Sequence, residues 1–117
     1  MSLRDTLTAS EPLRPTKWRR EIPGVVAAII AADREMDPGV DAATIRQSVL
    51  DQFRAALDPE VDDDLFFAEE EDGREVISFG IAVRMVLRHA RYDWSSPAAA
   101  ESVMAVAQRT LDETLPA

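Results

Sequence analysis

Apolar side chains recur every three or four residues in four stretches of this chain, and polar side chains fill the positions between them. This period places the apolar side chains of each stretch on one face of an α-helix. It predicts helices over residues 23–36, 42–57, 81–91 and 97–114. The predicted inward faces are, in order, Ile22, Val25, Val26, Ile29, Ile30 and Met36; Ile45, Val49, Phe53 and Leu57; Val83, Val86, Leu87 and Ala90; and Val103, Val106, Ala107 and Leu111.

Turn-forming and capping residues mark the ends of these helices. The run Asp37-Pro38-Gly39 ends the first helix, because the residue before a proline avoids the α conformation and glycine favours a turn. Asp41 is a suitable N-cap for the second helix, and Ser96 followed by Pro97 suits the start of the fourth. The run Asp58-Pro59 closes the second helix in the same way as the first.

The apolar period changes between the second and third helices. Leu65–Ala68 and Val76–Phe79 are rich in residues that favour strands, and Asp72-Gly73 between them is a two-residue hairpin signal. A turn closed at that position pairs Phe67 with Ser78. The whole pattern predicts an α+β fold that is mostly helical, with four helices and one acidic β-hairpin between the second and third.

The segments before the first helix differ from the rest of the chain. Residues 1–15 show no apolar period and contain two prolines, so we expect a flexible N-terminal arm followed by a single α+β domain over residues 16–117. The run Lys17-Trp18-Arg19-Arg20 is a short basic patch. It has two interpretations: a solvated lead-in whose Trp18 packs on the core, or a docking segment anchored by Trp18 with cations at its rim.

The negative charge of the chain is concentrated in one segment. The chain has 22 acidic and 13 basic residues, and its formal net charge is −9. Ten carboxylates and one arginine lie between Asp58 and Glu75, so this acidic segment (residues 58–75) carries a charge equal to that of the whole chain. Such a surface disfavours nucleic acids and anionic membranes as partners and favours a cationic protein.

Several classes of chemistry find no support in the sequence. The chain has no cysteine, which excludes disulfides, thiolate nucleophiles and cysteine-ligated metals. It also lacks a recognisable cofactor fingerprint, and we expect no cofactor. Residues 1–15 have no apolar stretch typical of a signal peptide, and the longest apolar run, Val25–Ala32, is far shorter than the roughly 20 residues of a membrane-spanning helix. We therefore expect a soluble, cytoplasmic protein.

Metal and catalytic sites are weakly indicated. The segment Asp58–Glu69 places oxygen ligands at most EF-hand positions, but Asp63 stands where the sharp turn needs glycine, so a solvated acidic loop is the favoured interpretation. His89 is the only histidine, and Asp93 follows it at i+4. No nucleophile or oxyanion hole accompanies them, because the nearby Ser95 suits a helix cap. We predict no catalytic and no metal-binding residues.

Two sets of residues remain as candidate sites. The first is a set of partner-binding residues in two places, the basic patch and the predicted hairpin: Trp18, Arg19, Phe66, Phe67, Glu69, Glu70, Glu71 and Asp72. The second is Arg84, Arg88 and Arg91, whose spacing places them on one helix face, where like charges repel. These arginines form a salt network with the acidic hairpin, within the chain or across a dimer, or an anion-binding or acidic-partner site, or a plain solvated face.

These features predict a small acidic, non-enzymatic protein-interaction module that binds a basic protein partner or associates with itself as a homodimer. Regulators, inhibitor or immunity proteins and assembly chaperones share its small size and acidity. One alternative is a nucleic-acid mimic that blocks a DNA-binding protein, although the bunching of the carboxylates counts against it. Another is a small-anion-binding protein or enzyme that uses the arginine face.

Overall fold

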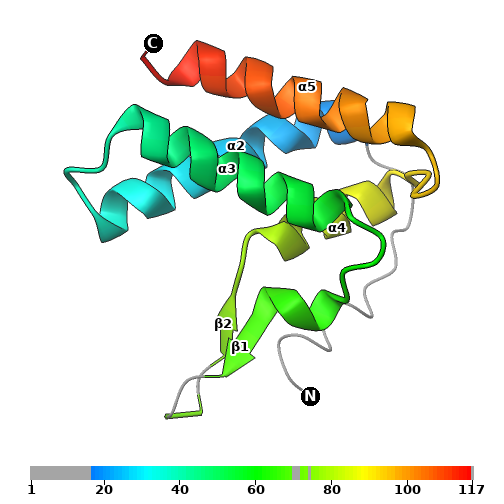
Figure 1. The fold of residues 1–117 in the computed structure, drawn as a ribbon, viewed down its shortest axis with the longest axis horizontal. Helices are drawn as coiled ribbons and strands as arrows, with labels where there is room; N and C mark the ends of the chain where they lie inside the picture. Colours follow the sequence, from blue (N-terminus) through cyan, green and yellow to red (C-terminus); the bar gives the residue numbers. More distant parts are fainter. Residues whose placement is uncertain (1–16, 70–71, 74, 117) are drawn as a thin grey trace.

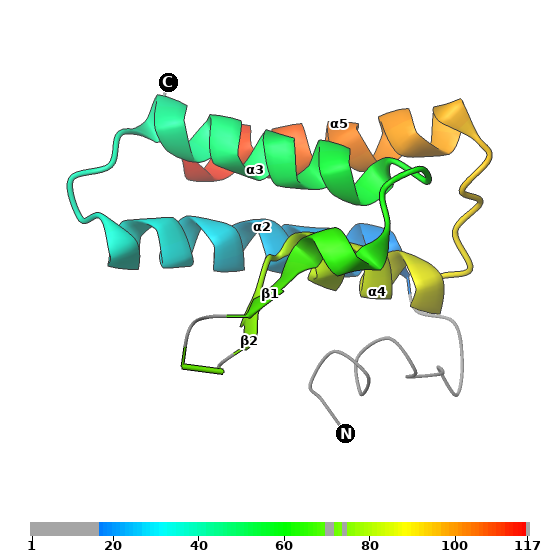
Figure 2. The ribbon, with the colours of Figure 1, turned by 60° about the horizontal axis from the view of Figure 1, so that its bottom comes forward.

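The computed structural model describes residues 17–69, 72–73 and 75–116, and its α-helices lie in two layers (Figure 1). Figure 2 shows α2 (Trp18–Met36) and α4 (Gly80–His89) in one layer and α3 (Ala42–Leu57) and α5 (Pro97–Thr114) in the other. Helix α2 contacts each of the other three, and α3 contacts α4 and α5. The core therefore lies between the two layers.

The core is almost entirely aliphatic. Most of the predicted inward faces are buried, but Met36 is 88 % exposed because it is the last residue of α2 and extends past the packed region. The buried apolar residues are Ile22, Val26, Ile29, Ile30, Ile45, Val49, Leu50, Phe53, Ala56, Leu57, Phe66, Ile81, Val83, Leu87, Val103, Val106, Ala107, Leu111 and Leu115. Helical periodicity alone was sufficient to predict most of this set.

Two of the predicted helix caps are confirmed. The Asp41 carboxylate accepts a hydrogen bond from the backbone N–H of Thr44 at 2.7 Å, and side-chain and backbone hydrogen bonds from Thr44 lower the pKa of Asp41. The Ser96 hydroxyl accepts from the N–H of Ala99 at 3.1 Å. Each cap pairs one of the N–H groups that a helix N-terminus leaves without a partner.

The first helix begins earlier than the sequence predicts. Helix α2 starts at Trp18, five residues before Pro23, so the predicted lead-in supplies its N-cap, Lys17, and its first three residues. Pro23 lies inside the helix, where it removes one backbone donor. The burial of Ile22 and Val26 on either side of this proline shows how packing overrides its unfavourable helix propensity.

The predicted α+β fold with a β-hairpin is wrong, because the described residues form a four-helix domain. Between α3 and α4 the chain forms a short 3-10 helix, η1 (Asp63–Phe66), and two strands of only three residues each, β1 (Phe67–Glu69) and β2 (Glu75–Ile77). These strands project away from the helices and add no layer to the fold (Figures 1 and 2). The core needs no sheet, since helices supply both of its faces.

The pairing of the two strands also differs from the predicted register. Phe67 lies opposite Ile77 and Glu69 opposite Glu75, whereas the two-residue turn would have paired Phe67 with Ser78. Five residues separate the end of β1 from the start of β2, compared with the two of the predicted turn, and Gly73 among them has a φ of 82°. The predicted arm of residues 1–15 and the predicted contacts of residues 70, 71 and 74 lie outside the described residues.

Helix α4 ends two residues before the predicted position. The N–H of Tyr92 donates to the carbonyl oxygen of Leu87 at 2.9 Å, and the N–H of Arg91 donates to that of Arg88 at 3.1 Å. This pair of bonds is the Schellman motif. Its residue directly after the C-cap takes a left-handed conformation and is usually glycine. Arg91 occupies that position with a φ of 57° and therefore leaves the helix face that carries Arg88.

Candidate functional site

A buried arginine joins α4 to the start of the acidic segment. Arg84 is only 5 % exposed. Its Nε donates to the carbonyl oxygen of Ala56 at 3.0 Å, and its Nη2 donates to that of Asp58 at 2.7 Å. Both carbonyls lie at the C-terminal end of α3, where unpaired carbonyl groups and the helix dipole attract a cation. Arg84, which belongs to α4, therefore caps the C-terminus of α3.

Asp63 provides the counter-charge for two arginines. Its Oδ1 accepts from Nη1 of Arg84 at 2.8 Å, and both of its carboxylate oxygens accept from Nη2 of Arg88 at 2.7 Å. Partial burial acts to raise the pKa of Asp63, but the hydrogen bonds and charges of the two arginines outweigh it and hold that pKa below its usual value. Two guanidinium groups around one carboxylate leave a local excess of one positive charge.

The ring of Phe66 forms the floor beneath Arg84. The Cζ atom of Arg84 lies 4.8 Å from the centroid of this ring, a cation–π geometry. The backbone of Gly80 lies against the same ring, so closely that a Cβ at position 80 would overlap Phe66. Phe66 is 4 % exposed and belongs to the core, in contrast to the partner-binding role that the sequence suggested for it.

A polar hollow opens above these arginines, and we name it the arginine pocket. It has a volume of about 210 Å³, and the described residues that line it are Pro59, Arg84, Arg88 and Trp94. The Trp94 and Tyr92 rings pack nearly perpendicular to each other, with an interplanar angle of 79° and centroids 4.9 Å apart. This contact holds the indole beside Arg84, whose guanidinium carbon lies 5.9 Å from the ring centroid. Arg91 is not among the described lining residues.

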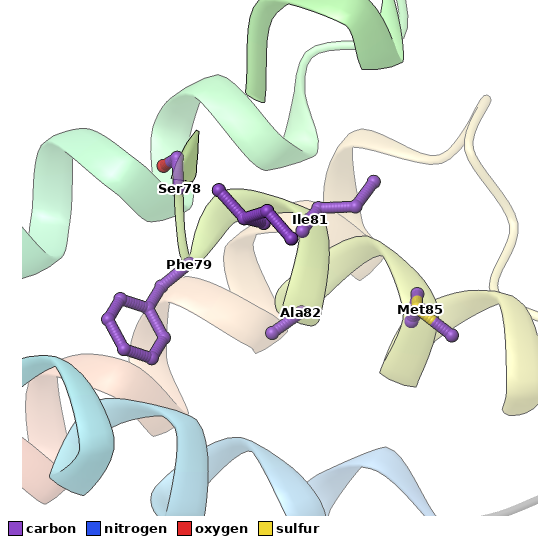
Figure 3. A pocket seen from close by; sticks show the side chains of 6 residues that line it. Ser78, Phe79, Ile81, Ala82 and Met85 are labelled. Atoms are coloured by element: carbon purple, nitrogen blue, oxygen red, sulfur yellow. The ribbon is translucent and has the colours of Figure 1, made fainter. Parts of the chain in front are cut away.

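A second hollow, which we name the apolar pocket, lies where β2 leads into α4 (Figure 3). It has a volume of about 250 Å³. The described residues that line it are Ile77, Ser78, Phe79, Ile81, Ala82 and Met85. Ser78 is the polar residue among them, and its hydroxyl donates to Oε1 of Gln52 at 3.4 Å. The apolar pocket therefore offers a hydrophobic surface at the end of the acidic segment.

The structure describes the predicted partner-binding residues only in part. Trp18 and Arg19 lie in the first turn of α2, with the Arg19 guanidinium 4.4 Å from the Trp18 ring, and with Lys17 they line a hollow of about 240 Å³. Phe67 is partly buried in β1, and Asp72 is exposed. Glu69 lies in β1, whereas the predicted roles of Glu70 and Glu71 fall outside the described residues.

His89 and Asp93 make different contacts from the pairing that the sequence suggested. The Nε2 atom of His89 is buried and has no hydrogen-bond partner in the described part of the chain. The carboxylate of Asp93 instead accepts from the N–H of Ser95 at 3.0 Å and from its hydroxyl at 2.6 Å. These bonds lower the pKa of Asp93. Asp93 therefore stabilises the turn before α5.

The described carboxylates of the segment that resembles an EF-hand loop in sequence make separate contacts. Asp58 accepts from the N–H of Glu60 at 2.9 Å, and Asp62 accepts from the N–H of Asp64 at 2.9 Å. Asp63 turns instead toward the arginines. Over residues 17–69, 72–73 and 75–116, no group of three or more histidine or acidic side chains is arranged to hold a metal ion.

Sequence reasoning missed the apolar pocket, because its residues read equally well as the inner face of a strand and a helix. The available signal was the mostly apolar stretch from Val76 to Val83, in which only Ser78 and Gly80 are not apolar.

None of the helices in the described part of the chain is both long and apolar enough to cross a membrane. Comparisons with protein-family models, with curated proteins and with solved structures gave no match for this chain.

Proposed function

We propose that this chain is a small, non-enzymatic protein-interaction module that binds a cationic amphipathic segment of another protein. The apolar pocket receives an apolar side chain of that segment, and the acidic segment attracts its basic residues. The observation that carries the proposal is the position of the apolar pocket, which begins at Ile77 in β2, the strand that ends the acidic segment, and continues along α4 to Met85.

The apolar pocket has the size and lining of a side-chain anchor site. Its volume of about 250 Å³ lies near the lower end of ligand pockets, which suits one large side chain rather than a whole cofactor. Phe79, Ala82 and Met85 follow one another at intervals of three residues, so they lie along one side of the start of α4 (Figure 3). Apolar anchors in pockets with a charged rim are typical of protein interfaces.

The charge of the neighbouring segment selects the partner. The acidic segment carries the equivalent of the chain's whole net charge of −9. The strand register places the backbone of Glu69 opposite that of Glu75. A cationic partner is attracted by the negative charge of this segment, whereas a second copy of the same chain adds like charge to it. A basic partner is therefore favoured over a homodimer through this surface.

The proposal is tested with a synthetic peptide as the probe. The peptide is a helix-forming sequence of leucines at i, i+3, i+4 and i+7 with lysines elsewhere, and its control is a scrambled peptide of the same composition. We expect the amphipathic peptide to bind at least about tenfold more tightly than the scrambled one, as measured by fluorescence anisotropy. Met85→Glu should abolish this preference, because it places a charge in the apolar pocket.

Two matched controls separate the pocket from general electrostatics. Met36→Glu makes the same change at a methionine that is 88 % exposed at the end of α2, and it should leave binding unchanged. Reversal of Glu69, Glu70 and Glu71 to lysine should weaken binding far more than reversal of three exposed glutamates on other helices, Glu35, Glu101 and Glu113. Equal binding of both peptides, or equal effects of both triple variants, would contradict the proposal.

A further inference from the structure

We propose that the arginine pocket binds a small aromatic carboxylate, with the carboxylate on Arg88 and the aromatic ring beside Trp94. This site shares no described lining residue with the apolar pocket, so it stands independently of the function proposed above. Three properties of the pocket support this inference: the charge of its two arginines, its remaining hydrogen-bond donors and its apolar side chains, Pro59 and Trp94.

Two of the described residues that line the pocket are arginines, although the chain as a whole is acidic. Asp63 neutralises one of the two guanidinium groups around it, and the second charge has no further acidic partner in the described ion pairs. Arg84 is fixed in place by bonds to two backbone carbonyls and to Asp63, so its charge cannot swing out into solvent. A preorganised excess positive charge in a partly enclosed hollow favours an anion.

Donor groups remain on the side of Arg88. Among the described residues, both hydrogen bonds of Arg88 come from Nη2, so its Nε–H and Nη1–H groups are not used in them. The side chain of Arg88 is 38 % exposed, compared with 6 % for that of Arg84. Arg88 therefore has the access and the donors to bind a carboxylate, whereas Arg84 mainly supplies a fixed positive charge.

The walls of the pocket select the rest of the ligand. The Trp94 indole and the Pro59 ring line the pocket beside the arginines and supply its apolar groups. The volume of about 210 Å³ exceeds the roughly 150 Å³ cavity that holds benzene, and it is below that of most drug-sized ligand pockets. One aromatic ring with one carboxylate fits this space, and the indole face adds a stacking contact that an inorganic anion cannot make.

The test is a titration of the full chain with benzoate, followed by the indole N–H signal of Trp94 in ¹H–¹⁵N NMR spectra. Trp18→Phe assigns that signal, because the chain has two tryptophans. Benzamide, which lacks the charge, and acetate, which lacks the ring, are the ligand controls. We expect benzoate to give a saturable shift and to bind at least about tenfold more tightly than either control.

Matched arginine variants locate the carboxylate. Arg88→Gln should weaken benzoate binding at least about tenfold, whereas Arg91→Gln, three residues further on and past the end of α4, should leave it unchanged. If Arg88→Gln fails to fold, the Nε–H signal of Arg88 in the wild-type chain decides, because the proposal requires benzoate to shift it. No saturable shift up to about 20 mM, or equal affinity for benzamide or acetate, would overturn the proposal.

Discussion

Arg84 and Asp63 form an ion pair of 2.8 Å across 21 positions of sequence, and both side chains are largely buried. The pair fixes η1 against α4, so the acidic segment leaves the helical domain at a defined place. The same arginine binds the last turn of α3 through the carbonyl of Ala56. One side chain thus joins two helices and the segment that carries the chain's excess charge.

Asp63→Asn should destabilise the domain by about 3 kcal/mol, because it leaves the buried Arg84 without its counter-charge. Chemical denaturation monitored by circular dichroism measures this change. The matched control is Asp62→Asn, since Asp62 caps η1 through an acceptor oxygen that asparagine retains. It should change the free energy of unfolding by less than about 0.5 kcal/mol. Equal effects of the two substitutions on the free energy of unfolding would show that the ion pair does not stabilise the domain in the expected way.

The stabilising effect of Asp63 should depend on pH. The folded-state pKa of Asp63 is lowered, so its contribution is complete above the unfolded pKa of about 3.9 and is lost as pH falls through the folded value. The difference in unfolding free energy between wild type and Asp63→Asn should therefore be constant from about pH 5 to 7 and shrink below about pH 4. Asp41 and Asp93 have lowered pKa values in both proteins, so their effects cancel in this difference. A difference that persists at low pH would argue against the assignment.

Two glycines in helices should respond in opposite ways to alanine. Gly80→Ala should destabilise by about 1–3 kcal/mol, because the new methyl group overlaps the Phe66 ring. Gly24→Ala should stabilise by about 0.5–1 kcal/mol, since nothing lies within 4 Å of its added Cβ and alanine favours the helix. Thermal unfolding of both variants measures the contrast. Stabilisation by both would mean that Phe66 does not pack on Gly80.

Arg91→Gly should stabilise the domain by about 0.5–1 kcal/mol, because glycine takes the left-handed conformation at the end of α4 without the steric penalty of a Cβ. Arg91→Ala retains that penalty and removes the same charge, so it should be neutral or slightly destabilising. Parallel denaturation curves of the two variants give the comparison. A gain with alanine equal to that with glycine would instead attribute the effect to charge.

The helices could be predicted because their signals are local. Period 3.6 in the apolar positions and capping residues such as Asp41 and Ser96 are legible within a few residues of each boundary. Boundaries failed where distant packing decides them. Trp18 extends α2 past a proline because it packs against the core, and Arg91 ends α4 in a conformation that its residue type does not favour.

The predicted fold class was wrong because of a segment whose short apolar runs suit either a strand or a buried helical segment. Leu65–Ala68 reads as a strand, yet Phe66 turns into the helical core because Gly80 leaves room for its ring. The candidate sites were also beyond local reasoning. The sequence indicates that clustered arginines need a counter-charge, but only tertiary packing brings Asp63, rather than another of ten carboxylates, to Arg84 and Arg88.

The proposed binding of a cationic amphipathic segment in the apolar pocket can be tested by titrating ¹⁵N-labelled wild-type chain with the leucine–lysine peptide and following the backbone amide shifts. We expect the largest shifts at residues 77–85, with little change around the exposed end of α2 at Met36. Shifts spread evenly over exposed carboxylates on all four described helices, or no shifts, would contradict it.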